Sequence, residues 1–167
     1  IIHLEPISDI HIGHAGFDEE HYKKRIKAIS KDKNRYTFFG GDALDAITTY
    51  DKRFNPDMSL EHDIDNQRLR WQNLSQKLFD IHAEQKNEKV WGFFHGNHDY
   101  KIPQISRAYL QNTMCTPNNL TFLGSRGVLG LEVKYNKKIL AQWSILFMHG
   151  SGGGKPERMM EQMKHNA

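Results

Sequence analysis

The sequence predicts an α/β fold whose first half is a mainly parallel sheet. Short apolar runs typical of strands alternate with two amphipathic segments, in the order strand, helix, strand, long helix, strand. Such an order is typical of parallel strands joined by right-handed crossovers. The chain of 167 residues has the size of one domain with a substantial core, so we expect a single domain over residues 1–167.

The first strands follow from their apolar side chains. Residues 1–8 form an apolar run that we expect to be a buried strand ending at Asp9. Residues 36–39 are a short aromatic strand closed by two glycines, and residues 90–94 are the next strand. Between the second and third strands, residues 48–60 contain proline, asparagine and several charges, which predicts a surface loop.

Two helices connect these strands. Residues 17–30 have apolar side chains at helical spacing, and Asp18 can cap this helix. Residues 64–85 predict a long amphipathic helix. The apolar residues of that helix are Leu69, Trp71, Leu74, Leu78 and Ile81. Its basic residues Arg68, Arg70 and Lys77 are expected on the solvent-facing side.

The second half of the chain is expected to contain more strands and two further helices. Residues 136–137 are an Asn-Lys pair that predicts a hairpin turn. The expected strands are 120–123, 128–135 and 139–148, and the expected helices are 103–111 and 156–165.

Composition excludes several classes of protein. The single cysteine, Cys115, leaves no internal disulfide framework and suits a reducing compartment. No apolar run approaches the ~20 residues of a membrane span, and no signal peptide is visible, so we expect a cytoplasmic protein without a membrane partner. A net charge of +3 is compatible with an anionic substrate. Because the chain starts inside strand-like sequence, we expect it to be part of a longer protein.

Polar side chains follow four of the predicted strands, at the point where each strand ends. In chain order they are Asp9 and His11, then Asp42 and Asp45, then Asn97, His98 and Asp99, and finally His149. If these strands are neighbours, their carboxyl ends bring the polar groups to one edge of the sheet. Nitrogen and oxygen ligands without thiolates suit Mn²⁺, Fe or Zn²⁺.

Each of these motifs has an ordinary explanation when taken alone. A D-x-H pair occurs often by chance, G-G-D and G-N-H-D can be polar turns, and a histidine at a strand end usually has no special role. Their occurrence together, in order, at four strand ends predicts a metal site. The glycines beside them allow the backbone to turn sharply and approach the site closely.

The ordered set D-x-H, G-D-x-x-D, G-N-H-D and H-G resembles the calcineurin-like metallophosphoesterase superfamily over almost the whole chain. The resemblance implies a four-layer α/β/β/α sandwich that holds two divalent metal ions, with Mn²⁺ favoured and Fe or Zn²⁺ as alternatives. It implies that Asp9 and His11 hold the first ion, that Asp42 bridges, and that Asn97 and His149 hold the second.

The resemblance also assigns catalytic roles. His98 is implied to be the general acid or a phosphate-contacting group, oriented by Asp45, and Asp99 stands where many relatives carry glutamate. The superfamily closes its site with a G-H-x-H motif that this chain lacks, since His165 does not match it, so we expect the fold to be incomplete at its C-terminus. Ala46 replaces the arginine typical of the phosphoprotein phosphatase branch and counts against that branch.

The predicted function is metal-dependent hydrolysis of phosphoester bonds, with a phosphodiesterase or nuclease acting on nucleic acid or nucleotides as the leading hypothesis. Alternatives are a small-molecule phosphomonoesterase and a non-catalytic scaffold of the same fold. Basic and aromatic residues of the 48–60 loop could pair with phosphates and stack on bases, or could simply belong to a solvated loop. They are Tyr50, Lys52, Arg53 and Phe54.

Weaker signals remain. The segment G-S-G-G-G-K-P at 150–156 fails as a phosphate-binding P-loop because Pro156 replaces the Ser or Thr that would hold Mg²⁺, although Lys155 is a candidate phosphate contact. Five other histidines are expected to have no special role. His21 and His82 lie on expected helices and should face the solvent, and His95 should have a structural role. His14 and His62 are expected to be ordinary, although His14 could also line the cleft.

Overall fold

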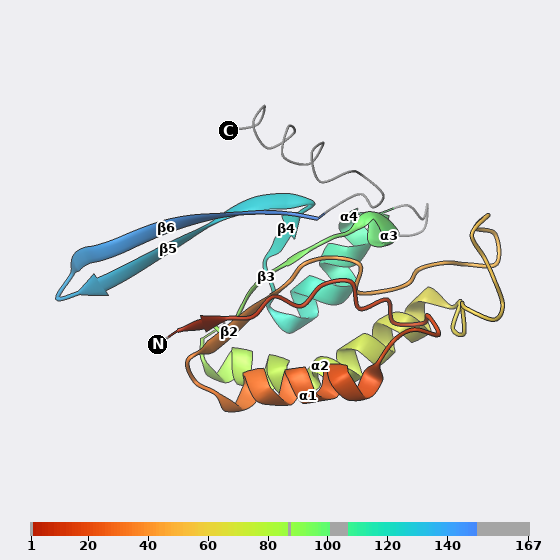
Figure 1. The fold of residues 1–167 in the computed structure, drawn as a ribbon, viewed down its shortest axis with the longest axis horizontal. Helices are drawn as coiled ribbons and strands as arrows, with labels where there is room; N and C mark the ends of the chain where they lie inside the picture. Colours follow the sequence, from red (N-terminus) through yellow and green to blue (C-terminus); the bar gives the residue numbers. More distant parts are fainter. Residues whose placement is uncertain (1, 87, 101–106, 150–167) are drawn as a thin grey trace.

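The protein is mixed α/β, with a four-stranded parallel sheet, helices and a separate two-stranded hairpin (Figure 1). The computed structural model describes residues 2–86, 88–100 and 107–149. In the parallel sheet the strand order follows the chain, β1-β2-β3-β4, and β5 pairs with β6 in antiparallel fashion. The strands are β1 (His3–Leu4), β2 (Arg35–Phe39), β3 (Val90–Phe94), β4 (Phe122–Gly124), β5 (Arg126–Tyr135) and β6 (Lys138–Met148).

Two long helices cover one face of the parallel sheet (Figure 1). They are α1 (Glu19–Lys31) and α2 (Ile64–Glu84). As predicted, Asp18 caps α1 by accepting a hydrogen bond of 2.8 Å from the backbone N–H of His21. On α2, Trp71 and Phe79 pack against Phe39 of β2, with ring centroids 5.2 and 6.1 Å away. These rings form the centre of the core on that face.

The remaining helical segments are short. They are α3 (Asn97–Tyr100) and α4 (Arg107–Leu110), followed by a π-helical turn (Gln111–Cys115) and a 3₁₀ turn (Thr116–Asn118). Of the helix expected over 103–111, residues 103–106 lie outside the described residues, and α4 is present over Arg107–Leu110. The 48–60 loop forms turns without a helix or a strand, as expected. The helix expected over 156–165 lies outside the described residues.

The base of the β5–β6 hairpin packs on the sheet face opposite the long helices. Phe147 of β6 contacts Phe38 and Phe94, with ring centroids 4.7 and 4.3 Å away. The rest of the hairpin extends away from the sheet (Figure 1). Asn136 and Lys137 both have positive φ, 49° and 65°, which is the backbone of a type I′ turn, so the predicted hairpin is confirmed.

One expectation about the strands was wrong. The run expected over residues 1–8 is not a buried strand over its described part, residues 2–8, because β1 lies at the sheet edge and Ile2 is 53% exposed. Beyond β1, the backbone N–H groups of Glu5 and Ile7 still donate to the carbonyl oxygens of Tyr36 and Phe38 in β2. The fourth strand with a polar end, β6, pairs with β5 in the predicted hairpin.

No helix in the described part of the chain combines the length and apolar character that a membrane crossing requires.

Candidate metal centre

The loops that follow β1 and β2 run side by side, joined by backbone hydrogen bonds. The N–H groups of Asp9 and His11 donate to the carbonyl oxygens of Gly41 and Asp42, each at 3.0 Å. The N–H of Asp45 returns a bond of 3.0 Å to the first loop. This pairing places the side chains of both predicted motifs at the same edge of the sheet.

Three of the predicted ligands have a left-handed backbone. Asp9, His11 and Asp42 have φ angles of 54°, 51° and 50°. For residues with a Cβ this conformation costs on the order of 1–3 kcal/mol each, and it persists only where surrounding bonds hold it. Such residues cluster at functional sites, and here three of them lie in two paired loops.

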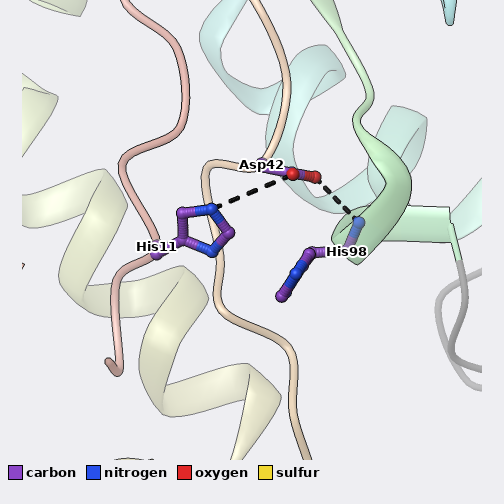
Figure 2. A group of neighbouring side chains, drawn as sticks. All are labelled: His11, Asp42 and His98. Atoms are coloured by element: carbon purple, nitrogen blue, oxygen red, sulfur yellow. Dashed lines mark hydrogen bonds and ion pairs between the residues drawn. The ribbon is translucent and has the colours of Figure 1, made fainter. Parts of the chain in front are cut away.

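Asp42 is the centre of the cluster, and its side chain is buried. Its Oδ1 accepts the backbone N–H of His98 at 2.8 Å, and its Oδ2 lies 3.1 Å from Nε2 of His149. Nε2 of His11 lies 3.9 Å from the same Oδ2. Figure 2 shows the ring of His11, from the loop after β1, and the backbone nitrogen of His98, in α3, both directed at the carboxylate of Asp42. Burial opposes ionisation of Asp42, but the bonds from His149 and His98 outweigh it and lower its pKa.

Two glycines make this close approach possible. A Cβ on Gly96 would collide with the carboxylate and the backbone nitrogen of Asp42. Gly41 has a φ of +99°, and a Cβ there would meet the backbone of Gly96 and the ring of His149. The glycines of G-G-D and H-G-N therefore bring the loops after β2 and β3 into direct contact.

Asp99 joins the same two loops through hydrogen bonds to their backbones. Its side chain is fully buried, and Oδ2 accepts the backbone N–H groups of Asp42 at 2.8 Å and Gly96 at 2.9 Å. Burial raises the pKa of this carboxyl to about 6. We did not predict this positioning role from the sequence, and the signal for it was the acidic residue that closes G-N-H-D.

His98 is oriented by Asp45, mainly through the backbone. Nδ1 of His98 lies 2.6 Å from the carbonyl oxygen of Asp45 and 3.7 Å from its carboxylate. A carbonyl can only accept, so Nδ1 carries a proton and Nε2 is left as a potential ligand or acceptor. The Asp45 carboxylate is closer to Nδ1 of His11, at 3.5 Å, and this contact raises the pKa of His11.

His149 reaches Asp42 from the end of the hairpin. Its Nδ1 donates to the carbonyl oxygen of Gly40 at 2.8 Å, so its Nε2 is directed at the Asp42 carboxylate. An imidazole whose Nδ1–H is held by a backbone carbonyl and whose Nε2 faces other ligands is the usual arrangement of a metal-binding histidine. Without a cation, Asp42 instead favours a second proton on the ring and raises the pKa of His149 to about 9.

Within the described part of the chain, two groups of three side chains could each hold a metal ion. One consists of His11, Asp42 and His98, and the other of Asp9, Asp42 and His149; the donor atoms within each group lie within 4.8 Å of one another. Asp42 belongs to both groups. The oxygen and imidazole donors fit a divalent cation of the Mn²⁺, Fe or Zn²⁺ type.

The grouping differs from the ligand pairs that the resemblance implies, since His149 lies with Asp9 and His98 with His11. Asn97 begins α3, is half-buried and precedes His98 directly, so it lies in the same loop. Its role as a ligand stays a prediction. Lys155 and His165 lie outside the described residues.

A cavity of about 390 Å³ opens beside the cluster. It is lined by Asp9, Ile10, His11, His14, Gly16, Asp45, Ile47 and His98. A neighbouring cavity of about 380 Å³ between the loop after β1 and the start of α1 shares three of these residues. The cluster therefore has open space next to the imidazoles of His11 and His98.

The remaining histidines are mostly as expected. His14 lines the cavity, His21 and His62 are exposed, and the ring of His95 stacks on Phe122. The prediction for His82 was wrong. It is 1% exposed, its Nδ1 accepts the backbone N–H of Val90 at 3.0 Å, and Nε2 lies 3.2 Å from a carbonyl oxygen.

Comparison with protein-family models, curated proteins and solved structures finds no match to this chain.

Proposed function

We propose that the protein is a metal-dependent phosphoester hydrolase of the calcineurin-like metallophosphoesterase type. The observation that carries this proposal is the position of Asp42, whose carboxylate is shared by two groups of potential ligands. The order of the motifs along the chain supports it independently. The hairpin base, packed on the sheet face opposite α1 and α2, is compatible with the second sheet of a four-layer sandwich.

The residues divide the work of hydrolysis as follows. Asp42, His11, Asp9 and His149 hold two divalent cations, Mn²⁺ in the first place, with Fe or Zn²⁺ as alternatives. When bound, such ions lower the pKa of a coordinated water and offset negative charge on the phosphoryl oxygens. His98 lines the cavity through an imidazole whose Nδ1–H is held by the carbonyl oxygen of Asp45, so its Nε2 would donate to the leaving oxygen of the substrate once it carries a second proton.

Phosphodiesters of nucleic acids or nucleotides are the proposed substrate class. The net charge of +3 favours an anionic substrate, and the 48–60 loop brings an arginine to within 3.3 Å of His98. The open cavity beside the cluster leaves space for organic groups on the phosphate.

The test combines metal binding with hydrolysis. Calorimetric titration with Mn²⁺ should show binding that the Asp42→Asn variant loses, because both groups need this carboxylate. The matched control is Asp57→Asn, which changes an exposed aspartate and should bind as the wild type does. Mn²⁺-loaded wild type should hydrolyse bis-p-nitrophenyl phosphate.

Each outcome bears on a different part of the proposal. Cleavage of p-nitrophenyl phosphate alone would overturn the phosphodiester assignment in favour of a monoesterase. Metal binding without cleavage of either ester would point to a non-catalytic scaffold. Equal Mn²⁺ affinity of wild type and Asp42→Asn would refute the metal centre itself.

A further inference from the structure

The loop at 48–60 brings one cationic side chain to the candidate metal centre. Nη1 of Arg53 lies 3.3 Å from Nε2 of His98. Because Nδ1 of His98 carries the proton that is bound by the Asp45 carbonyl, Nε2 accepts the hydrogen bond from Arg53. The guanidinium is thus one hydrogen bond away from an imidazole that lines the cavity.

The guanidinium of Arg53 is held in place from its other side. Asp51 accepts from Nε at 2.9 Å and from Nη2 at 2.6 Å, a two-pronged contact with the carboxylate. Asp51 also accepts the backbone N–H of Arg53 at 2.8 Å. This local ring of bonds fixes the orientation of the side chain before any ligand arrives, which lowers the entropic cost of binding.

Arg53 retains hydrogen-bonding capacity for a ligand. A guanidinium has five N–H groups. Two are directed at Asp51 and one at His98, and the side chain is 31% exposed. The carboxylates of Asp51, Asp45 and Asp42 raise its pKa further, so the group stays charged.

We propose that Arg53 binds a non-bridging oxygen of the substrate phosphoryl group at the candidate metal centre. This inference rests on the proposed function and adds a substrate-contacting residue to it. Guanidinium groups bind phosphate oxygens through short, charge-assisted hydrogen bonds.

A purely structural role for Arg53 makes different predictions. If the side chain only tied the loop to His98, its removal would lower stability and disturb the metal ligands, without a specific effect on phosphate binding. The neighbouring Lys52 provides a matched control, because it is exposed and carries the same charge in the same loop.

The test compares Arg53→Ala, Arg53→Lys and Lys52→Ala in the Mn²⁺-loaded protein. We expect Arg53→Ala to lower kcat/KM for bis-p-nitrophenyl phosphate by about 10²-fold. The affinity for inorganic phosphate, measured by calorimetry, should fall by roughly 10-fold or more. Arg53→Lys should recover part of both losses, whereas Lys52→Ala should stay within about twofold.

The outcomes separate this inference from the proposed function. Unchanged phosphate affinity in Arg53→Ala overturns it, as does a loss matched by lower thermal stability and weaker Mn²⁺ binding. If the wild type cleaves neither ester but binds phosphate through Arg53, the hydrolase proposal fails and the Arg53 contact stands. If the wild type hydrolyses the diester and Arg53→Ala is equally active, the hydrolase proposal stands and the Arg53 contact is refuted.

Discussion

Replacing Asp99 with asparagine should make stability less dependent on pH. The wild-type carboxyl is fully buried, and its pKa is raised from its ordinary value of 3.8 to about 6. Asparagine has nearly the same shape, and its amide oxygen can accept the N–H groups of Asp42 and Gly96 as the carboxylate does. In the wild type, Oδ1 of Asp99 accepts the N–H of Leu44 weakly, at 3.5 Å. The amide nitrogen of asparagine cannot accept this N–H, and the loss of that hydrogen bond lowers stability by an amount that does not change with pH.

The sign of the effect follows from proton binding. Between pH 3.8 and about 6 the folded protein holds a proton on Asp99 that the unfolded chain has already released. The free energy of unfolding therefore falls as pH rises through this window. A difference of about two pKa units corresponds to about 3 kcal/mol, of which roughly 2 kcal/mol lies between pH 4.5 and 7.

Urea unfolding of wild type and Asp99→Asn across this pH range, with a chelator present, measures the effect. The stability of the variant relative to wild type should rise by roughly 2 kcal/mol from pH 4.5 to pH 7. Asp57→Asn, at an exposed site, should show no such trend. A relative stability that is flat or falls with pH would refute the assignment of a buried, hard-to-ionise carboxyl beneath the two loops.

Two further substitutions test the packing around the site. His82→Ala should lower stability by about 1–3 kcal/mol more than His82→Asn, because asparagine can still accept the buried N–H of Val90; equal losses in urea unfolding would contradict this. Gly96→Ala should weaken Mn²⁺ binding at least tenfold, because the new methyl group occupies the space of the Asp42 carboxylate. Gly130→Ala, in open space on the hairpin, should leave Mn²⁺ affinity unchanged, and similar affinities in both variants would refute the steric argument.

Local signals predicted most of the helices and strands. The Asp18 cap and apolar spacing located α1, and the long periodic segment located α2 to within one residue at its end. The buried side of α2 was less predictable, because three of its buried residues are polar. Gln67 binds the backbone of the 42–46 loop and Ser75 binds a tyrosine hydroxyl on α1. Because such partners are distant in sequence, hydropathy alone assigns these residues to the solvent-exposed face of the helix.

The candidate site was predictable in composition and less so in detail. The position of Asp9, His11 and Asp42 at the ends of parallel strands was enough to predict that they lie together, because parallel strands end at the same edge of a sheet. The pairing of His149 with Asp9 depends on how the hairpin returns to the sheet, which no local pattern specifies. The left-handed backbone at the ligands likewise results from tertiary contacts between two loops.

The hairpin has a thermodynamic consequence for a protein that binds metal at this edge. His149 and Asp42 are 107 positions apart, and the strand that carries His149 touches the sheet chiefly at its base. A cation held by both residues would act as a cross-link that closes this long loop. Binding of the ion and packing of the β5–β6 hairpin on the sheet would then be one coupled equilibrium. Removal of the ion by a chelator should therefore detach the hairpin before the parallel sheet unfolds.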